Sequence, residues 1–283
     1  MQREEKGVTI RQPATANLMI DSADRNSNVN PSAFDFQISR NNSILNGFFS
    51  RIGTTEVVLE WNEPNGAYLA PISTNITLPG GSVSTVTTEF GSLGFYTAEQ
   101  ALGHLCSTVS TVGGGLIITP NSNNGTLELG TFTGSNFDFD PSPSLQKLGL
   151  IANIAVPSLD IGPPDLRPFR YLDFVSQQLT YNQELKDTAT NTSTRDVLCR
   201  WYMAWDNPPT YDGLGFPILQ GYTPFTERRL FNPPKQIKWE PNMPIGNIAF
   251  QVFGNNTVVP ISDLVPVDNN GSQWLMTLQV SEN

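Results

Sequence analysis

Hydrophobic and polar residues alternate with a period of two in several segments of this chain. In Gln273–Val280, Trp274 and every second residue after it are apolar, and Thr277 and Gln279 lie between them. Ala33–Ser39 and Thr54–Trp61 alternate in the same way. Because successive side chains of a strand point to opposite faces, the pattern predicts strands with one face on a core.

Further segments show the strand pattern more briefly. They are Asn17–Asp21, Asp196–Trp205, the proline-rich Phe231–Trp239, Asn247–Phe253 and Val258–Ile261, together with Phe169–Val175 and Gln178–Tyr181, which are two strands or one bent strand. Four prolines between Asn232 and Pro244 favour an edge strand or an extended connector there. Gly254–Thr257 has the composition of a hairpin turn. About eight strands result outside residues 67–169, which is the number in a jelly roll.

Residues 67–169 have a different pattern. Thr97 and Gln100 form a capping box, and apolar residues then recur at helical spacing as far as Val109. Leu116–Thr119 and Gly125–Gly130 predict a hairpin, and Leu145–Leu148 predicts a short helical turn that ends at a glycine. Pro157–Pro168 is expected to be a linker. The sequence thus predicts an all-β fold, an eight-stranded jelly-roll β-sandwich with a small inserted α/β module.

The expected organisation has four parts. Residues 1–15 are an N-terminal arm that only a partner would hold in place. Residues 16–66 are the first part of the jelly roll, residues 67–169 are the inserted module, and residues 170–283 are the second part of the jelly roll.

Composition narrows the classes of function. The 283 residues carry a formal net charge of −10, and Arg228-Arg229 is only a pair of basic residues. An acidic chain without a basic patch is not expected to bind nucleic acid directly. No stretch approaches 18 apolar residues and the start is charged, so neither a transmembrane segment nor a signal peptide is expected. Cys106 and Cys199 are expected to be buried, reduced thiols.

The sequence contains no catalytic or metal-binding motif, so we predict no enzyme activity, no cofactor and no metal site. His104 is the only histidine and has no clustered partner. The polar loop Asp21–Asn28 lacks the spacing of a calcium loop, and Asx turns explain it better. Asp138 and Asp140 could pair as glycosidase carboxylates, but a loop that caps the following helix is favoured. A glycan-active enzyme remains the weakest alternative.

Two segments have the composition of an interface. The loop 206–225 is aromatic and rich in Gly and Pro, and residues 231–244 are rich in proline. We therefore predict subunit contacts at Tyr211, Phe216, Tyr222, Phe225, Arg228, Arg229, Pro233 and Pro234. The five tryptophans are interpreted as core residues rather than as a carbohydrate-binding platform.

Several motifs carry a family resemblance. They are Ile20–Arg25, Ala33–Phe36, Phe95–Leu102, Ser144–Leu150, Arg195–Trp201, Gly215–Ile218, Phe231–Ile237, Asn242–Asn247 and Trp274–Gln279. Together they resemble penton or minor capsid proteins of DNA viruses whose main shell protein is a double jelly roll, which include large eukaryotic DNA viruses, virophages and polinton-like viruses. The resemblance spans nearly the whole chain, and its motifs are structural.

The resemblance implies a virion protein, made in the host cytoplasm or nucleus, that forms a homopentamer at the fivefold vertices. Its expected partners are itself, the double-jelly-roll major capsid protein and other minor capsid proteins. A cement protein between major capsid trimers is an alternative within the same lineage. A receptor- or glycan-binding role for residues 67–169 is an alternative from a different class.

Overall fold

The computed structural model describes most of the chain. The described residues are 15–39, 51–121, 126–131, 133–162, 164–180, 185–186, 194–195, 197–203, 225–234, 236–238, 246–255 and 271–281. They divide into two compact units. The sandwich unit contains the described residues up to Trp61, those within Tyr171–Tyr202 and those from Phe225 onward. The module unit contains Asn62–Arg170 together with Met203.

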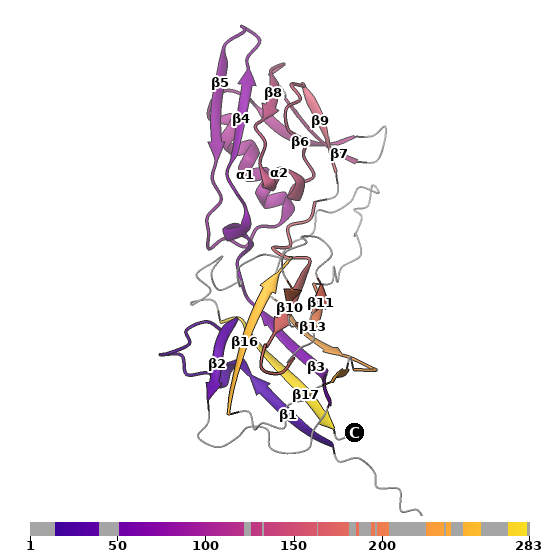
Figure 1. Ribbon diagram of the computed structural model, residues 1–283. Helices are drawn as coiled ribbons and strands as arrows, with labels where there is room; N and C mark the ends of the chain where they lie inside the picture. Colours follow the sequence, from indigo (N-terminus) through magenta and orange to yellow (C-terminus); the bar gives the residue numbers. More distant parts are fainter. Residues whose placement is uncertain are drawn as a thin grey trace, which may run out of the picture. The chain divides into compact units, whose positions relative to one another are not determined.

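The sandwich unit contains two antiparallel sheets (Figure 1). The first sheet has, in spatial order, β1 (Thr15–Asp21), β17 (Gln273–Ser281), β3 (Arg51–Trp61) and β14 (Phe225–Leu230), and β15 (Gln236–Lys238) also pairs with β3. The second sheet has β13 (Val197–Tyr202), β10 (Tyr171–Val175), β16 (Asn247–Gly254) and β2 (Asp35–Ser39). A short separate ladder joins β11 (Leu185–Lys186) to β12 (Thr194–Arg195).

The strand order is that of a jelly roll. Because β14 and β15 both pair with β3, they occupy one position, and the two main sheets then hold eight strand positions in the described residues. Numbered along the chain, one sheet holds positions 1, 8, 3 and 6, and the other holds 5, 4, 7 and 2. Strands distant in sequence therefore pair directly, as in a jelly roll built from two Greek keys. The predicted all-β jelly-roll sandwich is confirmed.

Aromatic side chains fill the core of the sandwich unit. Trp274 is 1% exposed, and its ring centroid lies 5.4 Å from that of Phe36, 5.2 Å from Phe174 and 5.5 Å from Phe250. The indole Nε1 of Trp274 donates to the carbonyl oxygen of Ala33 at 2.7 Å. The predicted inward face of β17 is confirmed, since its alternate residues from Trp274 to Val280 are all buried.

The module unit combines two small sheets with two α-helices (Figure 1). One sheet has the order β5 (Val83–Thr88), β4 (Ile72–Thr77) and β8 (Asn136–Phe139), and the other has β6 (Leu116–Asn121), β7 (Thr126–Thr131) and β9 (Ser158–Ile161). The helices are α1 (Ala98–Ser110) and α2 (Pro143–Lys147). Short 3₁₀ turns lie at η1 (Ser22–Asp24) in the sandwich unit and at η2 (Asn65–Tyr68) in the module unit.

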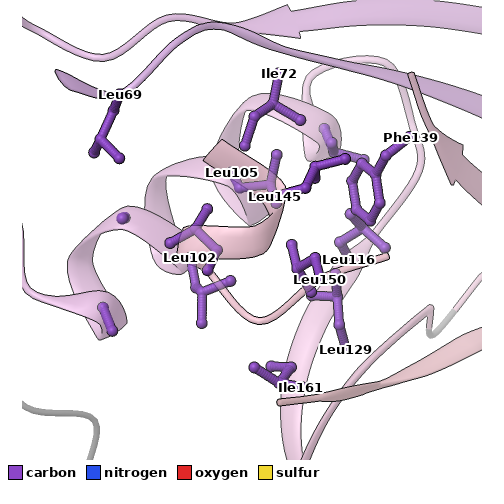
Figure 2. Packing of buried hydrophobic residues seen from close by; sticks show 14 of the residues in the cluster. Leu69, Ile72, Leu102, Leu105, Leu116, Leu129, Phe139, Leu145, Leu150 and Ile161 are labelled. Carbon is purple, nitrogen blue, oxygen red and sulfur yellow. The ribbon is translucent and has the colours of Figure 1, made fainter. Parts of the chain in front are cut away.

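Helix α1 begins where the sequence predicts. The Thr97 hydroxyl accepts from the Gln100 backbone N–H, and the Gln100 side chain accepts from the Thr97 N–H, both at 3.0 Å. The five apolar residues of its predicted stripe are all buried. Figure 2 shows Leu102 and Leu105 of this helix among Leu145, Leu150 and other aliphatic side chains. The core of the module unit is thus mainly aliphatic.

Two local predictions need correction. Pro157–Pro168 is not simply a linker, because Ser158–Ile161 forms β9 and pairs with β7. Residues 178–180 do not form a strand but belong to a turn, in which the Thr180 N–H donates to the carbonyl oxygen of Ser176. Helix α2 is capped by the hydroxyl of Ser142, which lies in the loop that is predicted to cap it. The predicted hairpin turn at Gly254–Thr257 continues outside the described residues.

Candidate subunit-contact surface

One edge of the first sheet carries five of the eight predicted contact residues. Strand β14 pairs with Glu56–Trp61 of β3, and β15 pairs with Arg51–Gly53 of the same strand. Since β17 occupies the other side of β3, β14 and β15 form one interrupted edge. The backbone N–H of Phe231 donates to the carbonyl oxygen of Thr55 at 2.9 Å and holds the chain against β3 at the interruption.

The residues of β14 alternate between two environments. Thr226, Arg228 and Leu230 are exposed, and Leu230 is 63% exposed. Arg228 forms an ion pair with Glu56 on the neighbouring strand β3. This face therefore combines the exposed aliphatic side chain of Leu230 with the charge of Arg228, which Glu56 neutralises.

The opposite face of β14 points charged groups toward the sandwich. Arg229 donates from Nη2 to Glu227 Oε1 at 2.8 Å, and its guanidinium carbon lies 4.6 Å from the ring centroid of Trp201. The Trp201 ring is fully buried, and its Nε1 has no hydrogen-bond partner among the described residues. A charged pair over an aromatic ring at a sheet edge discourages another strand from docking there.

The structure places the predicted residues unevenly. Phe225 and Pro234 are half-buried, Pro233 is exposed, and Arg228 and Arg229 share β14 with Phe225. The Asn232–Pro233 peptide bond is cis. Tyr211, Phe216 and Tyr222 lie outside the described residues. Contact of any of the eight residues with another subunit stays a prediction.

A second cluster on the sandwich unit was not predicted from the sequence. Arg200 of β13 donates from Nε and Nη2 to the two carboxylate oxygens of Asp173 on β10, at 2.6 and 2.8 Å. Its guanidinium carbon lies 4.0 Å from the ring centroid of Tyr171. The Tyr171 and Tyr202 rings meet edge to face at 6.0 Å, and Tyr202 is 57% exposed. Asp173, in contrast, is only 1% exposed.

The electrostatics of this cluster favour a fixed arrangement. The hydrogen bond to Asp173 is the main reason that the pKa of Arg200 is raised, so the guanidinium stays charged and oriented. Exposed tyrosine and arginine side chains are over-represented at protein interfaces. Two signals were available in the sequence, namely the charged residue inside the apolar segment Val197–Trp201 and the tyrosine that follows it.

Asp138, Asp140 and His104 each have a hydrogen-bond partner within the module unit. The Asn75 amide donates to Asp138 at 3.4 Å and to Asp140 at 3.1 Å, and His104 Nε2 lies 2.8 Å from the carbonyl oxygen of Glu89. In the polar loop, Asp21 accepts from the Ala23 N–H and Asn26 accepts from the Asn28 N–H, which confirms the Asx turns.

Across the described ranges, no group of three or more His, Cys, Asp or Glu side chains could hold a metal ion. Cys106 and Cys199 are free cysteines, and Cys199 is buried as predicted, whereas Cys106 is only half-buried. Burial raises the pKa of Cys106 to about 11. No helix in the described part of the chain has the length and apolarity needed to cross a bilayer.

Comparison with known proteins relates the fold to a solved structure. No protein-family model matches the chain, and no curated protein sequence matches it. The crystal structure of the selenomethionine-labelled mavirus penton protein is similar to it, with a TM-score of 0.52 and 12% sequence identity. The similarity covers 96% of this chain and 99% of that chain. The chain therefore shares the fold of the mavirus penton protein, and the shared fold extends over both the sandwich unit and the module unit.

Proposed function

We propose that this chain is a structural capsid protein, a penton that forms homopentamers at the fivefold vertices of an icosahedral virion. The observation that carries the proposal is the extent of the similarity to the mavirus penton protein. A jelly roll alone would say little about function, because many unrelated proteins use one. A match that spans both units of the chain is a more specific relation than a shared sandwich.

The mechanism is geometric rather than chemical. A head-to-tail contact between two different surfaces of one subunit closes into a ring when the rotation per subunit divides a full turn. The β14–β15 edge with Phe225, Arg228, Arg229, Pro233 and Pro234 is the proposed first surface. The outer face of such a ring would contact the double-jelly-roll major capsid protein and other minor capsid proteins.

Native mass spectrometry of the purified chain tests the ring directly. We expect a dominant species at five times the chain mass of 31.1 kDa. A double variant, Arg228→Ala with Phe225→Ala, should weaken the ring if β14 lies in the contact. Glu99→Ala, an exposed position in α1, is the matched control and should leave the ring intact.

The alternative, a cement protein, predicts a different result in solution. A chain that stays monomeric at all concentrations, and that binds only when major capsid trimers are added, would contradict the penton and support a cement protein.

A further inference from the structure

The two edges of the first sheet in the sandwich unit differ in how they are protected. The β14–β15 edge carries Glu227, Arg228 and Arg229 and is interrupted at Pro233 and Pro234. Inward-pointing charges and prolines are devices that stop another strand from adding to an edge. This edge is therefore closed to strand addition.

The opposite edge, β1, has none of these devices. It runs for seven residues, contains no proline and has no charged residue before Asp21. It pairs with β17 on one side, and no other described strand pairs with it. Met19, in the middle of the strand, is 66% exposed. The outward N–H and C=O groups of β1 are thus a ready template for a further strand.

The edges of the second sheet are less open than β1. Strand β2 has five residues and begins with Asp35, and β13 has six residues and carries Arg200. Short length and charge both disfavour the addition of a strand. Among the four edges of the two main sheets, β1 is the longest strand, and its only charged residue, Asp21, is at its end.

We propose that the free edge of β1 receives the segment Val8–Arg11 from the N-terminal arm of a second copy of this chain. This inference rests on the proposed ring, because the ring brings copies together. Val8, Thr9 and Ile10 are β-branched, the residue type that strands favour. Pro13 lacks an N–H and separates this segment from β1. Three residues, Gln12–Ala14, join this segment to β1, so in extended form Arg11 lies within about 13 Å of Thr15.

Two other occupants fit less well. A chain that folded its own arm onto β1 would have to reverse direction within Gln12-Pro13-Ala14, and a three-residue hairpin loop needs a left-handed residue such as glycine, which this segment lacks. Pairing of β1 with β1 of a second copy would be a twofold contact. A twofold contact does not build a fivefold ring. The binding of the N-terminal arm of one copy to β1 of the next is a head-to-tail contact, which can close into a ring.

A substitution that introduces a charge on β1 of the full chain tests the proposal. Met19→Lys places an edge-protecting lysine on β1 at a side chain that is already exposed. We expect the melting temperature of the free subunit to be unchanged and the ring to dissociate at protein concentrations at which the wild type is assembled. Val29→Lys is the matched control, because Val29 is 72% exposed in the same unit but lies in the loop after η1. It should assemble as the wild type does.

Cysteine trapping identifies the occupant. A chain with Ile10→Cys is mixed with a mass-tagged chain that carries Asn17→Cys or Met19→Cys, and disulfides are allowed to form. The proposal predicts a linked pair that contains one chain of each kind, with the wild-type chain as the background control. In a chain that carries both Ile10→Cys and Asn17→Cys, a disulfide that closes within one chain would overturn the proposal. An intact ring without any link between the mixed chains would overturn it as well.

The two proposals fail differently. If the wild-type chain forms no ring, the proposed function is contradicted. If the ring forms and Met19→Lys leaves it as stable as Val29→Lys does, the ring stands and the arm-to-edge contact is wrong. If β1 instead binds a strand of a different protein, the purified chain should also give this second result, because that protein is absent.

Discussion

The sandwich unit and the module unit obtain their cores from the sequence in different ways. In the sandwich unit, β1 near the start of the chain pairs with β17 near its end, and β17 pairs with β3. In the module unit, every described strand pairing lies within residues 72–161. Long loops must close before the sandwich gains its contacts, whereas the module needs only local closure. We therefore expect the module unit to fold first.

The two cores also differ in side-chain type. Phe36, Phe174, Phe250 and Trp274 meet in the sandwich unit, and leucine and isoleucine dominate the cluster in the module unit (Figure 2). Aromatic rings contribute large buried areas from few positions. A single truncation should therefore cost more in the sandwich than in the module, and the stability of the two units can be perturbed separately.

The largest effect is expected for Trp274→Ala. The change removes a fully buried ring with three aromatic neighbours and should lower the free energy of unfolding of the sandwich by about 3–5 kcal/mol. Chemical denaturation followed by tryptophan fluorescence measures it. Leu275→Ala, on the outward face of the same strand, should cost much less. A loss below about 0.5 kcal/mol for Trp274→Ala would mean that the faces of β17 are reversed.

A somewhat smaller effect is expected in the module unit. Leu105→Ala should lower the free energy of unfolding of this unit by about 3 kcal/mol, because Leu105 is 0% exposed. Hydrogen exchange read by mass spectrometry assigns the loss to its unit. Glu99→Ala, at an exposed position of the same helix, is the control. If exchange increased equally in the sandwich strands, the two units would unfold together and the comparison would break down.

The ion pair on the second sheet should contribute less. Asp173→Asn removes the carboxylate charge that accepts the two hydrogen bonds of Arg200. The change should lower the free energy of unfolding of the sandwich unit by about 1.5–3 kcal/mol. Glu60→Gln, an exposed position on β3, serves as the control in the same denaturation experiment. Equal stability of the two variants would show that Asp173 does not need its charge.

The smallest effect is expected at the start of α1. Thr97→Ala removes the hydroxyl that accepts from the Gln100 N–H and should cost about 1 kcal/mol in the module unit. Thr97→Ser keeps the oxygen and should restore most of that loss. Circular dichroism during denaturation measures the change. A serine variant with the same free energy of unfolding as the alanine variant would argue against the cap.

The sequence predicted those features that depend on local spacing. The alternation after Trp274 and the Thr97–Gln100 capping box are set by neighbouring residues, and both are confirmed. Strand β9 was missed because it has four residues between Pro157 and Gly162, which are turn-forming residues. The turn after β10 was predicted to be a strand, and its Gln178 side chain accepts from the Ala249 N–H, 71 residues away.

The candidate site was less accessible to sequence reasoning. Arg200 and Asp173 are 27 residues apart, and no local pattern links them. The open edge of β1 has no signal of its own either, because the order of strands in the sheet decides which strand lies at an edge. Such features depend on pairing between distant strands, which is why the structure was needed to find them.

The central claim is a ring at the vertex of a shell, and an icosahedral reconstruction of particles that contain this chain tests it most directly. The account predicts five copies of the sandwich unit and the module unit in the density at each fivefold axis. Density for this chain only between major capsid trimers, with a different protein on the fivefold axes, would contradict it.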